Sequence, residues 1–151
     1  MSELRLRRRI LGVDLGRARI GVAVSDELGM LAHPVETIPA SVDALRRIGQ
    51  LVQEKNAERV VIGLPRHMNG SVGTGATEAL AFAGKLRALV PCEVITWDER
   101  LTTTAANRAL RASGRKTRDS RAFVDQVAAQ MILQGYLDSL PATDIPDGFP
   151  S

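Results

Sequence analysis

Residues 9–25, which read RILGVDLGRARIGVAVS, contain two apolar runs rich in β-branched side chains. The runs, Arg9 to Leu15 and Arg19 to Ser25, are separated by three residues, a common length for a hairpin connection. A third run, Leu31 to Ile38, contains Pro34, which is typical of a short or edge strand because proline has no N–H to donate. We therefore expect three consecutive antiparallel strands near the start of the chain.

The next part of the chain alternates between helical and strand patterns. Ser41 is expected to cap a helix whose apolar residues recur at spacings of three and four. These residues are Val42, Leu45, Ile48, Leu51 and Val52. Short apolar runs at Arg59 to Leu64 and Cys92 to Trp97 are typical of buried parallel strands. Two parallel strands should thus join the antiparallel ones.

Three more helices are expected: one that ends near Val90, one over Thr102 to Ala112, and one that begins near Ser120. The broad apolar face of the first comprises Leu80, Ala83, Leu86, Ala88 and Leu89. The apolar stripe of the last comprises Val124, Val127, Ala128, Met131, Ile132 and Leu137.

The order of these elements, β-β-β-α-β-α-β-α-α, predicts an α/β fold. We expect a five-stranded mixed sheet, three strands antiparallel and two parallel, flanked by helices and joined by right-handed crossovers. This is the order of the ribonuclease H-like architecture. A single domain is expected over residues 1–140, and a disordered tail over 141–151, where prolines and acids replace apolar side chains.

The composition excludes several classes of protein. The 151 residues fit one domain, and 44% hydrophobic residues suffice for a core. No apolar run is long enough to span a membrane and the arginine-rich start does not resemble a signal peptide, so we expect a cytoplasmic protein without a membrane partner. Cys92 is the only cysteine and there are two histidines, so any metal should be held mainly by oxygen.

The net charge of +3 permits nucleic-acid binding, and the basic residues are concentrated in two runs. Both runs could contact phosphates, or they could be solvated faces. The first run contains Arg5, Arg7, Arg8 and Arg9, and the second contains Arg108, Arg111, Arg115, Lys116, Arg118 and Arg121.

Asp14 lies inside the first predicted strand, with apolar residues on both sides. A carboxylate there is costly to desolvate unless it is paired, hydrogen-bonded or bound to a cation. Asp14 is therefore a candidate functional residue. The alternative is a structural aspartate that accepts a hydrogen bond from the turn at Gly16.

Three further acids are candidates because of their positions. Asp98 and Glu99 close the last predicted strand, and ligands bind at the carboxyl ends of parallel strands. The alternative is that they are ordinary polar residues at the end of a strand, with Arg100 as their salt-bridge partner. Asp125 lies about five residues into the final predicted helix, beyond the turn where an acid merely complements the helix dipole. Alone, it could be a solvent-facing acid.

Together these acids predict a metal site. If the first strand is central and parallel to the last two, Asp14 and Glu99 or Asp98 share one sheet edge, and the final helix can bring Asp125 over it. Three carboxylates would form an oxygen-only site suited to Mg²⁺ or Mn²⁺. Such a site can support phosphodiester hydrolysis.

Four segments resemble the signature motifs of the YqgF family, also called RuvX. They are VDLGRARIGVA at 13–23, GLPRHMNGSVG at 63–73, DERLTT at 98–103 and VDQVAAQMILQGYL at 124–137. They occur in the family's order and cover nearly the whole predicted domain. One departure is that the family usually places lysines just before the last motif, where this chain has Ala122 and Phe123.

The resemblance implies a ribonuclease H-like fold and a nuclease dependent on Mg²⁺ or Mn²⁺. Its catalytic and metal-binding acids would be Asp14, Glu99 and Asp125, with Asp98 as the alternate metal ligand. It also implies maturation of the 5′ end of the small-subunit (16S) ribosomal RNA precursor, with Holliday junction resolution as the older proposal. The partner would be an RNA precursor, single-stranded DNA or branched DNA, bound by a monomer or a homodimer.

Ten polar residues near these motifs are candidates for nucleic-acid binding. They are Arg17, Arg19, Arg66, His67, Asn69, Arg100, Arg115, Lys116, Arg118 and Arg121. The alternatives are a turn-shaping role for Asn69, pairing with acids for Arg17, Arg19 and Arg100, no role for His67, and a solvated face for the basic run. Two other functions compete with the nuclease. One is an ATP-binding module of the actin or sugar-kinase type, suggested by the sequence DLG at 14–16. The other is a nucleic-acid scaffold without catalysis.

Overall fold

The computed structural model describes residues 9–65, 73–99 and 118–140. The helix expected over Thr102 to Ala112 and the tail expected over 141–151 lie outside these residues. The described elements are, in chain order, β1 (Arg9–Leu15), β2 (Arg19–Ser25), β3 (Ala32–Pro39), α1 (Ala44–Glu54), β4 (Ala57–Leu64), α2 (Thr74–Leu89), β5 (Glu93–Asp98) and α4 (Arg118–Ser139).

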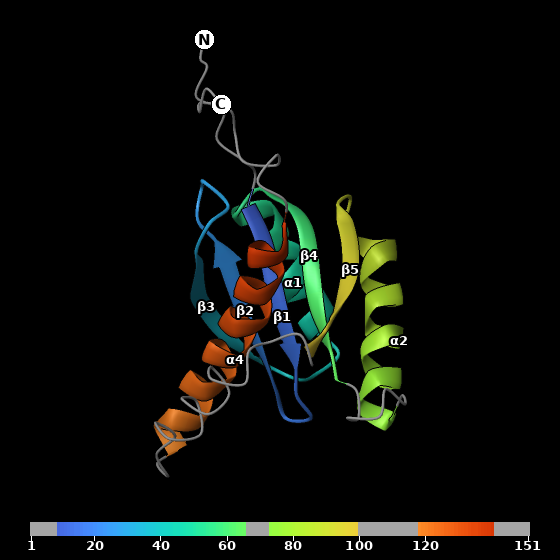
Figure 1. Ribbon diagram of the computed structural model, residues 1–151. Coiled ribbons are helices and arrows are strands. Elements are labelled where there is room, and N and C mark those ends of the chain that lie inside the picture. Colours follow the sequence, from blue (N-terminus) through green and yellow to red (C-terminus); the bar gives the residue numbers. More distant parts are fainter. Residues whose placement is uncertain (1–8, 66–72, 100–117, 141–151) are drawn as a thin grey trace, which may run out of the picture.

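The five strands form one sheet in the order β3-β2-β1-β4-β5 (Figure 1). β1 is antiparallel to β2, and β2 to β3, whereas β1 is parallel to β4, and β4 to β5. The expected mixed sheet is confirmed, and β1 and β2 have the expected bounds. β3 is an edge strand as expected but is not short, because a register shift between Val22 and Ala23 accommodates Pro34 in the pairing.

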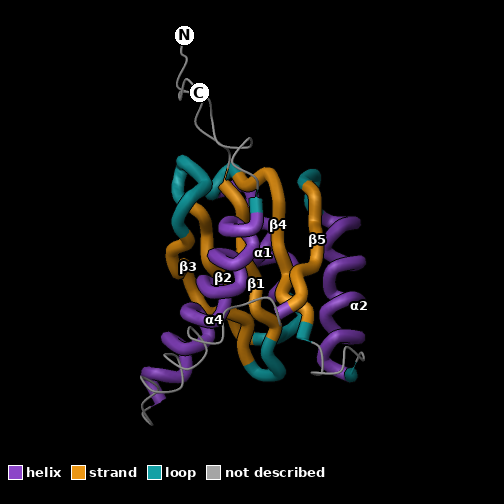
Figure 2. Tube along the Cα trace, in the orientation of Figure 1, coloured by secondary structure: helices purple, strands orange, loops and turns teal. Residues whose placement is uncertain are grey.

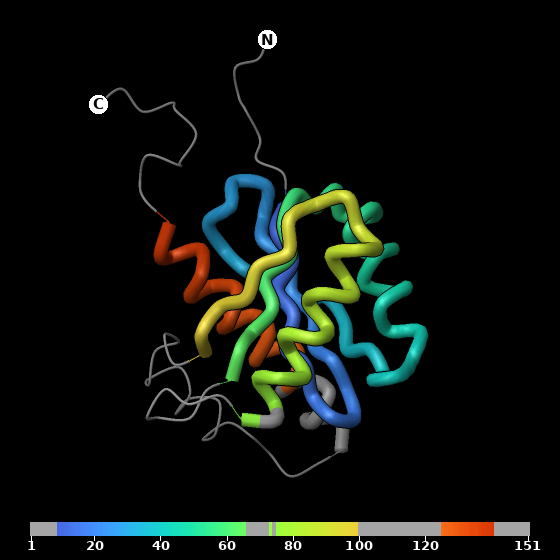
Figure 3. Tube along the Cα trace, turned by 90° about the vertical axis from the view of Figure 1, so that its right-hand side faces the viewer, coloured from blue at the N-terminus to red at the C-terminus, as the bar shows by residue number. Residues whose placement is uncertain are grey.

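Helices cover both faces of the sheet (Figures 2 and 3). In the view along the sheet, α4 lies on one side, and α1 and α2 lie on the other. Side chains alternate along a strand, so β1 contributes to two cores. Leu11 and Val13 pack in the core beneath α1 and α2, whereas Ile10 packs with the buried residues of α4. β1 is therefore buried on both faces, like the central strand of an α/β sheet.

A row of glutamines at spacings of four fixes the register of α4 against the edge strand β3. The Gln126 side chain donates to the Thr37 hydroxyl at 3.1 Å, and the Gln130 side chain donates to the Ala32 carbonyl at 2.9 Å. The Gln134 side chain accepts from the Ala32 N–H at 2.9 Å. These bonds determine which residues of α4 face the end of β1.

The start of α1 was wrongly predicted. The helix begins at Ala44 with Asp43 at the N-cap position, and Ser41 instead accepts from the Asp43 N–H within the preceding turn. Val42, expected in the apolar stripe, is 93% exposed because it lies in that turn. The buried stripe of α1 is Ala44, Ile48, Leu51 and Val52.

The apolar faces of the two later helices were predicted only in part. In α2, Ala83 and Leu86 are buried, whereas Leu80 and Leu89 are exposed. The buried stripe of α4 is Ala129, Ile132, Leu133, Tyr136 and Leu137. The predicted stripe was rotated because apolar residues occur around much of this helix, and only its contact with the sheet selects one face.

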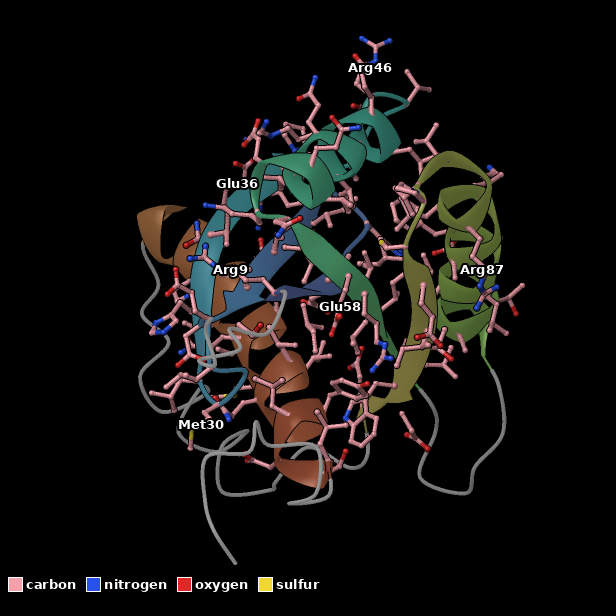
Figure 4. The ribbon with its side chains drawn as sticks, turned by 90° about the horizontal axis from the view of Figure 1, so that it is seen from above. Arg9, Met30, Glu36, Arg46, Glu58 and Arg87 are labelled. Atoms are coloured by element: carbon pink, nitrogen blue, oxygen red, sulfur yellow. The ribbon has the colours of Figure 1, made fainter. Side chains whose placement is uncertain are left out.

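An ion pair connects the edge strand to α1 on the other side of the sheet. Glu36 of β3 lies beside α1 (Figure 4), and its two carboxylate oxygens each accept from Arg47 at 2.8 Å. Such two-point pairing is geometrically specific. The hydrogen bonds of Arg47 and of the glutamine row thus anchor helices on both faces to β3. No helix in the described ranges is long and apolar enough to cross a membrane.

Candidate active site

Asp14 lies near the end of the central strand, at the edge of the sheet where β1, β4 and β5 all finish (Figure 1). It pairs directly with Gly21 of β2. On the other side, Val13 pairs with Ile62 of β4, so Gly63 is the next residue of β4 beside Asp14. Asp14 is therefore flanked by two residues that have no side chain.

The space above Gly21 is filled by the backbone of α4. A Cβ atom built on Gly21 would lie 2.0 Å from the carbonyl oxygen of Asp125. Only glycine allows such a close approach, which is one established use of glycine within a strand. Gly21 thus allows α4 to bring Asp125 next to Asp14, as predicted.

The space above Gly63 is filled by the carboxylate of Glu99. A Cβ atom on Gly63 would lie 2.7 Å from Oε2 of Glu99 and 2.5 Å from Cδ1 of Ile132 in α4. Ile95 and Trp97 of β5 pack in the core beneath α4, so alternation directs Asp98 away from that face. Of the two candidate acids, Glu99 is the one that lies over β4 beside Asp14.

Asp14 and Glu99 lie close enough to other carboxylates for their ionisation to be affected. Burial, followed by the nearby charge of Asp125, raises the pKa of Asp14 to about 6. Burial also raises the pKa of Glu99 to about 7, with further contributions from the charges of Asp14 and Asp98. Partly buried carboxylates at such pKa values are typical of functional sites and are stabilised by a cation.

These pKa values predict how stability depends on pH in the absence of divalent ions. A carboxyl group whose pKa is raised by folding stabilises the protein while it is protonated, and that stability is lost as pH rises through the folded-state pKa. Between about pH 4 and pH 7, Asp14 and Glu99 should each lower the free energy of unfolding by on the order of 2 kcal/mol.

The measurement is denaturant unfolding in chelator across this pH range, with Asp14→Asn as the reference. The other carboxylates, including Glu99, titrate in both proteins, so the difference between them isolates the contribution of Asp14. Adding Mg²⁺ at pH 7 should restore the lost stability to the wild type. Parallel pH profiles in the two proteins would contradict the prediction.

Asp125 is held by an ion pair with Arg19, the first residue of β2. Nε of Arg19 donates to Oδ2 of Asp125 at 2.7 Å, and the two side chains are 38% and 25% exposed. The alternatives for Arg19 were a phosphate contact and pairing with an acid, and the structure shows pairing. Arg19 thus fixes the position of the Asp125 side chain, while Gly21 provides the space for its backbone.

Removal of this ion pair should affect stability more than removal of an exposed one. Arg19→Ala should lower the free energy of unfolding by about 1 kcal/mol, since the pair is half-buried and well aligned. The control is Arg46→Ala, because Arg46 and Asp43 are 76% and 73% exposed and 3.8 Å apart. That loss should be less than about 0.3 kcal/mol. Equal losses in urea unfolding would show that Arg19 does not anchor α4.

The carboxylates of Asp14, Glu99 and Asp125 are suitable ligands for a divalent cation, but they are not arranged around a single point. Within residues 9–65, 73–99 and 118–140, no three Asp, Glu, His or Cys side chains are grouped closely enough to hold an ion. Carboxylate oxygens are the ligands that Mg²⁺ and Mn²⁺ prefer. As a metal ligand, Asp125 would share its carboxylate between the ion and Arg19, which donates to Oδ2.

The predicted nucleic-acid contacts are described only in part. Arg17 is exposed in the turn between β1 and β2. Arg118 and Arg121 belong to α4, but their side chains are outside the described set. The remaining candidates, Arg66, His67, Asn69, Arg100, Arg115 and Lys116, also lie outside the described residues.

Sequence reasoning missed the two glycines and one partly buried cluster of side chains. Gly21 and Gly63 occur in the quoted motifs, and a glycine inside a strand pattern is a signal of close approach. Trp97 packs edge-on against Tyr136, with ring centroids 5.6 Å apart, and Tyr136 accepts a hydrogen bond from Arg59. This cluster fixes the end of β5 against α4, just before Glu99.

A family model described as RuvX, Holliday junction resolvase, matches residues 8–139. The chain belongs to the RuvX family. The matched range contains all four RuvX motifs quoted above and all three acids of the candidate site. The predicted family is therefore confirmed.

Curated relatives match this chain over most of their own length. Proteins named "Putative pre-16S rRNA nuclease" from Halalkalibacterium halodurans and Acetivibrio thermocellus are 47% and 46% identical to this chain. The alignments cover 86% and 87% of this chain and 96% of each relative. A protein of the same name from Nocardia farcinica is 48% identical, over 90% of this chain and 81% of its own.

Solved structures resemble this RuvX chain in fold. Thermus thermophilus RuvC has a TM-score of 0.51 at 12% identity, covering 86% of this chain and 95% of its own. Fowlpox virus resolvase, solved with Holliday junction DNA, also has a TM-score of 0.51 at 12% identity, covering 87% and 97%. These likenesses confirm the ribonuclease H-like fold.

Proposed function

We propose that this chain is a divalent-metal-dependent nuclease that hydrolyses phosphodiester bonds in the 5′-end maturation of 16S ribosomal RNA precursors. The observation that carries the proposal is the convergence of Asp14, Glu99 and Asp125 at one sheet edge, where Gly21 and Gly63 leave space for the latter two. The names of relatives that are 46–48% identical over most of the chain support the choice of substrate.

The three carboxylates would hold Mg²⁺ or Mn²⁺. When bound, such an ion activates water and stabilises the leaving oxygen of a phosphodiester. Asp14 would be the central ligand, because it lies between the other two acids and is supplied by the middle strand of the sheet. Arg17, exposed beside this edge, is available to neutralise a flanking phosphate.

Holliday junction resolution is the second candidate function. It is favoured by the description of the family model and by the fold shared with resolvases. The two functions differ in assembly, because symmetric nicks in a junction favour a two-fold dimer, whereas cleavage of a single strand requires only a monomer. We place the activity in the cytoplasm, where ribosomal RNA is processed.

The test is cleavage by the full chain of three substrates: a single-stranded precursor RNA, single-stranded DNA of the same sequence, and a four-way junction. Each is incubated with Mg²⁺, with Mn²⁺ or with chelator. We expect metal-dependent cleavage, strongest on the RNA. Preference for the junction would support the second function. Binding of RNA without cleavage of any substrate would replace both with the scaffold function.

A further inference from the structure

A cavity of about 310 Å³ opens at the same edge of the sheet as Asp14 but on the opposite face. Its floor includes Leu15 of β1 and Ile20 of β2, which pack with the core beneath α1 and α2. Asp14 and Leu15 are consecutive, so alternation places the acid and the cavity on the two sides of one strand end. A nucleic-acid strand that crosses this edge of the sheet could contact both Asp14 and the cavity.

The cavity has apolar walls and exposed polar side chains. Leu15, Ile20 and Phe82 provide aliphatic and aromatic contacts. Among the described residues, the charged side chains of the lining are Arg17, which can only donate hydrogen bonds, and Glu78, which accepts them when ionised. An apolar slot with a few polar groups at its rim is the usual composition of a small-molecule site.

We propose that this cavity binds one unpaired nucleobase of the substrate strand, next to the phosphodiester that is cleaved. This inference rests on the proposed nuclease function and adds a single-stranded requirement to it. The flat faces of a base match the apolar walls and Phe82, since bases stack on aromatic side chains. The donors and acceptors along the edge of a base match Glu78 and Arg17.

Size and charge distinguish a base from other ligands. A volume of about 310 Å³ is at the lower end for small-molecule sites, which suits a single nucleoside rather than a dinucleotide. A phosphate group would be repelled by Glu78 and would find one arginine among the described lining residues. A base within a duplex is stacked and paired and could not enter, so the strand must be open at this nucleotide.

The test uses the full chain and fluorescence anisotropy with a labelled single-stranded RNA in chelator, so that cleavage cannot occur. Ala40→Trp places a large side chain at the exposed rim of the cavity. The matched control is Val42→Trp, because Val42 is also exposed but is not part of the lining. Ala40→Trp should weaken binding roughly tenfold and Val42→Trp by less than about twofold.

Two further arms test the identity of the occupant. Binding of the same RNA as a duplex should be equal in both variants. In the wild type, one abasic nucleotide at a single position should weaken single-strand binding roughly tenfold, and Ala40→Trp should remove that sensitivity. Thermal unfolding checks that the variants are folded. If Ala40→Trp is not folded, Ser41→Trp replaces it, because Ser41 also lies at the rim of the cavity.

Equal single-strand binding by the Ala40 and Val42 variants would overturn the proposal. It would also be overturned if no abasic nucleotide, at any position of the RNA, weakened binding to the wild type. These results do not depend on catalysis. Metal-dependent cleavage without an Ala40→Trp effect would eliminate the base site alone. An Ala40→Trp effect without cleavage by the wild type would eliminate the nuclease and keep the base site.

Discussion

Replacement of Asp14 by asparagine should reduce metal-dependent cleavage by at least about 100-fold while the protein stays folded. Asp14 lies between Asp125 and Glu99, so its loss removes the acid that links the other two. Asparagine has nearly the same shape but no charge. The substitution therefore tests charge at a position where the packing is preserved.

The same variant should be more stable than the wild type in chelator at pH 8. Asp14 has a pKa raised to about 6, so its ionised form opposes folding at that pH, and asparagine removes this penalty. At pH 4 the carboxyl group is largely protonated in the folded protein, and the two stabilities should converge. An inactive but destabilised variant at pH 8 would point to a structural aspartate, and an active folded variant would contradict the proposed role.

Gly21→Ala should destabilise the protein by about 2 kcal/mol or more and abolish cleavage. The new Cβ would lie 2.0 Å from the Asp125 carbonyl oxygen, which belongs to the backbone of α4 and cannot rotate away. The hydrogen bonds of the glutamine row also resist displacement of the helix. The whole first half of α4 would have to move, and Asp125 with it.

Two other glycine variants make this prediction specific. Gly84 lies in α2 with nothing within 4 Å of an added Cβ, so Gly84→Ala should stabilise the protein by up to about 1 kcal/mol and leave cleavage unchanged. At Gly63 the added Cβ meets the ends of the Ile132 and Glu99 side chains. Gly63→Ala should therefore cost less stability than Gly21→Ala but still reduce cleavage by displacing the Glu99 carboxylate.

The measurements are urea unfolding and the precursor cleavage assay on all three variants. A Gly21→Ala protein as stable and active as Gly84→Ala would show that α4 is not held against β2 at this point. It would also remove the argument that the position of Asp125 depends on Gly21.

The strands and their order along the chain could be predicted from local patterns. β1 and β2 have the bounds expected from residues 9–25, because their apolar runs end sharply at polar and glycine residues. The three acids could be proposed because strand ends converge at one edge and because four family motifs occur in order. The apolar runs and the motifs each lie within a short segment, and the convergence of the strand ends follows from the order of those segments along the chain.

The errors arose where a local pattern was ambiguous. Ser41 is a good capping residue by type, but it serves the turn before α1, and Val42 is exposed for the same reason. In α4, apolar residues occur around much of the helix, so its sequence did not determine which face is buried. The contact of Leu133 with Gly12 selects that face.

The details of the site depend on residues that are far apart in the chain. Arg19 and Asp125 are 106 positions apart, and the partner of Arg19 could not be known before α4 was placed on the sheet. The role of Gly21 and the cavity between β1, β2, α1 and α2 likewise arise only from packing. Short-range periodicity determines which elements form and in what order along the chain, because the repeat of apolar side chains that marks a helix or a strand lies within a few consecutive residues. Tertiary contacts determine which side chains meet, because that depends on how the elements approach one another.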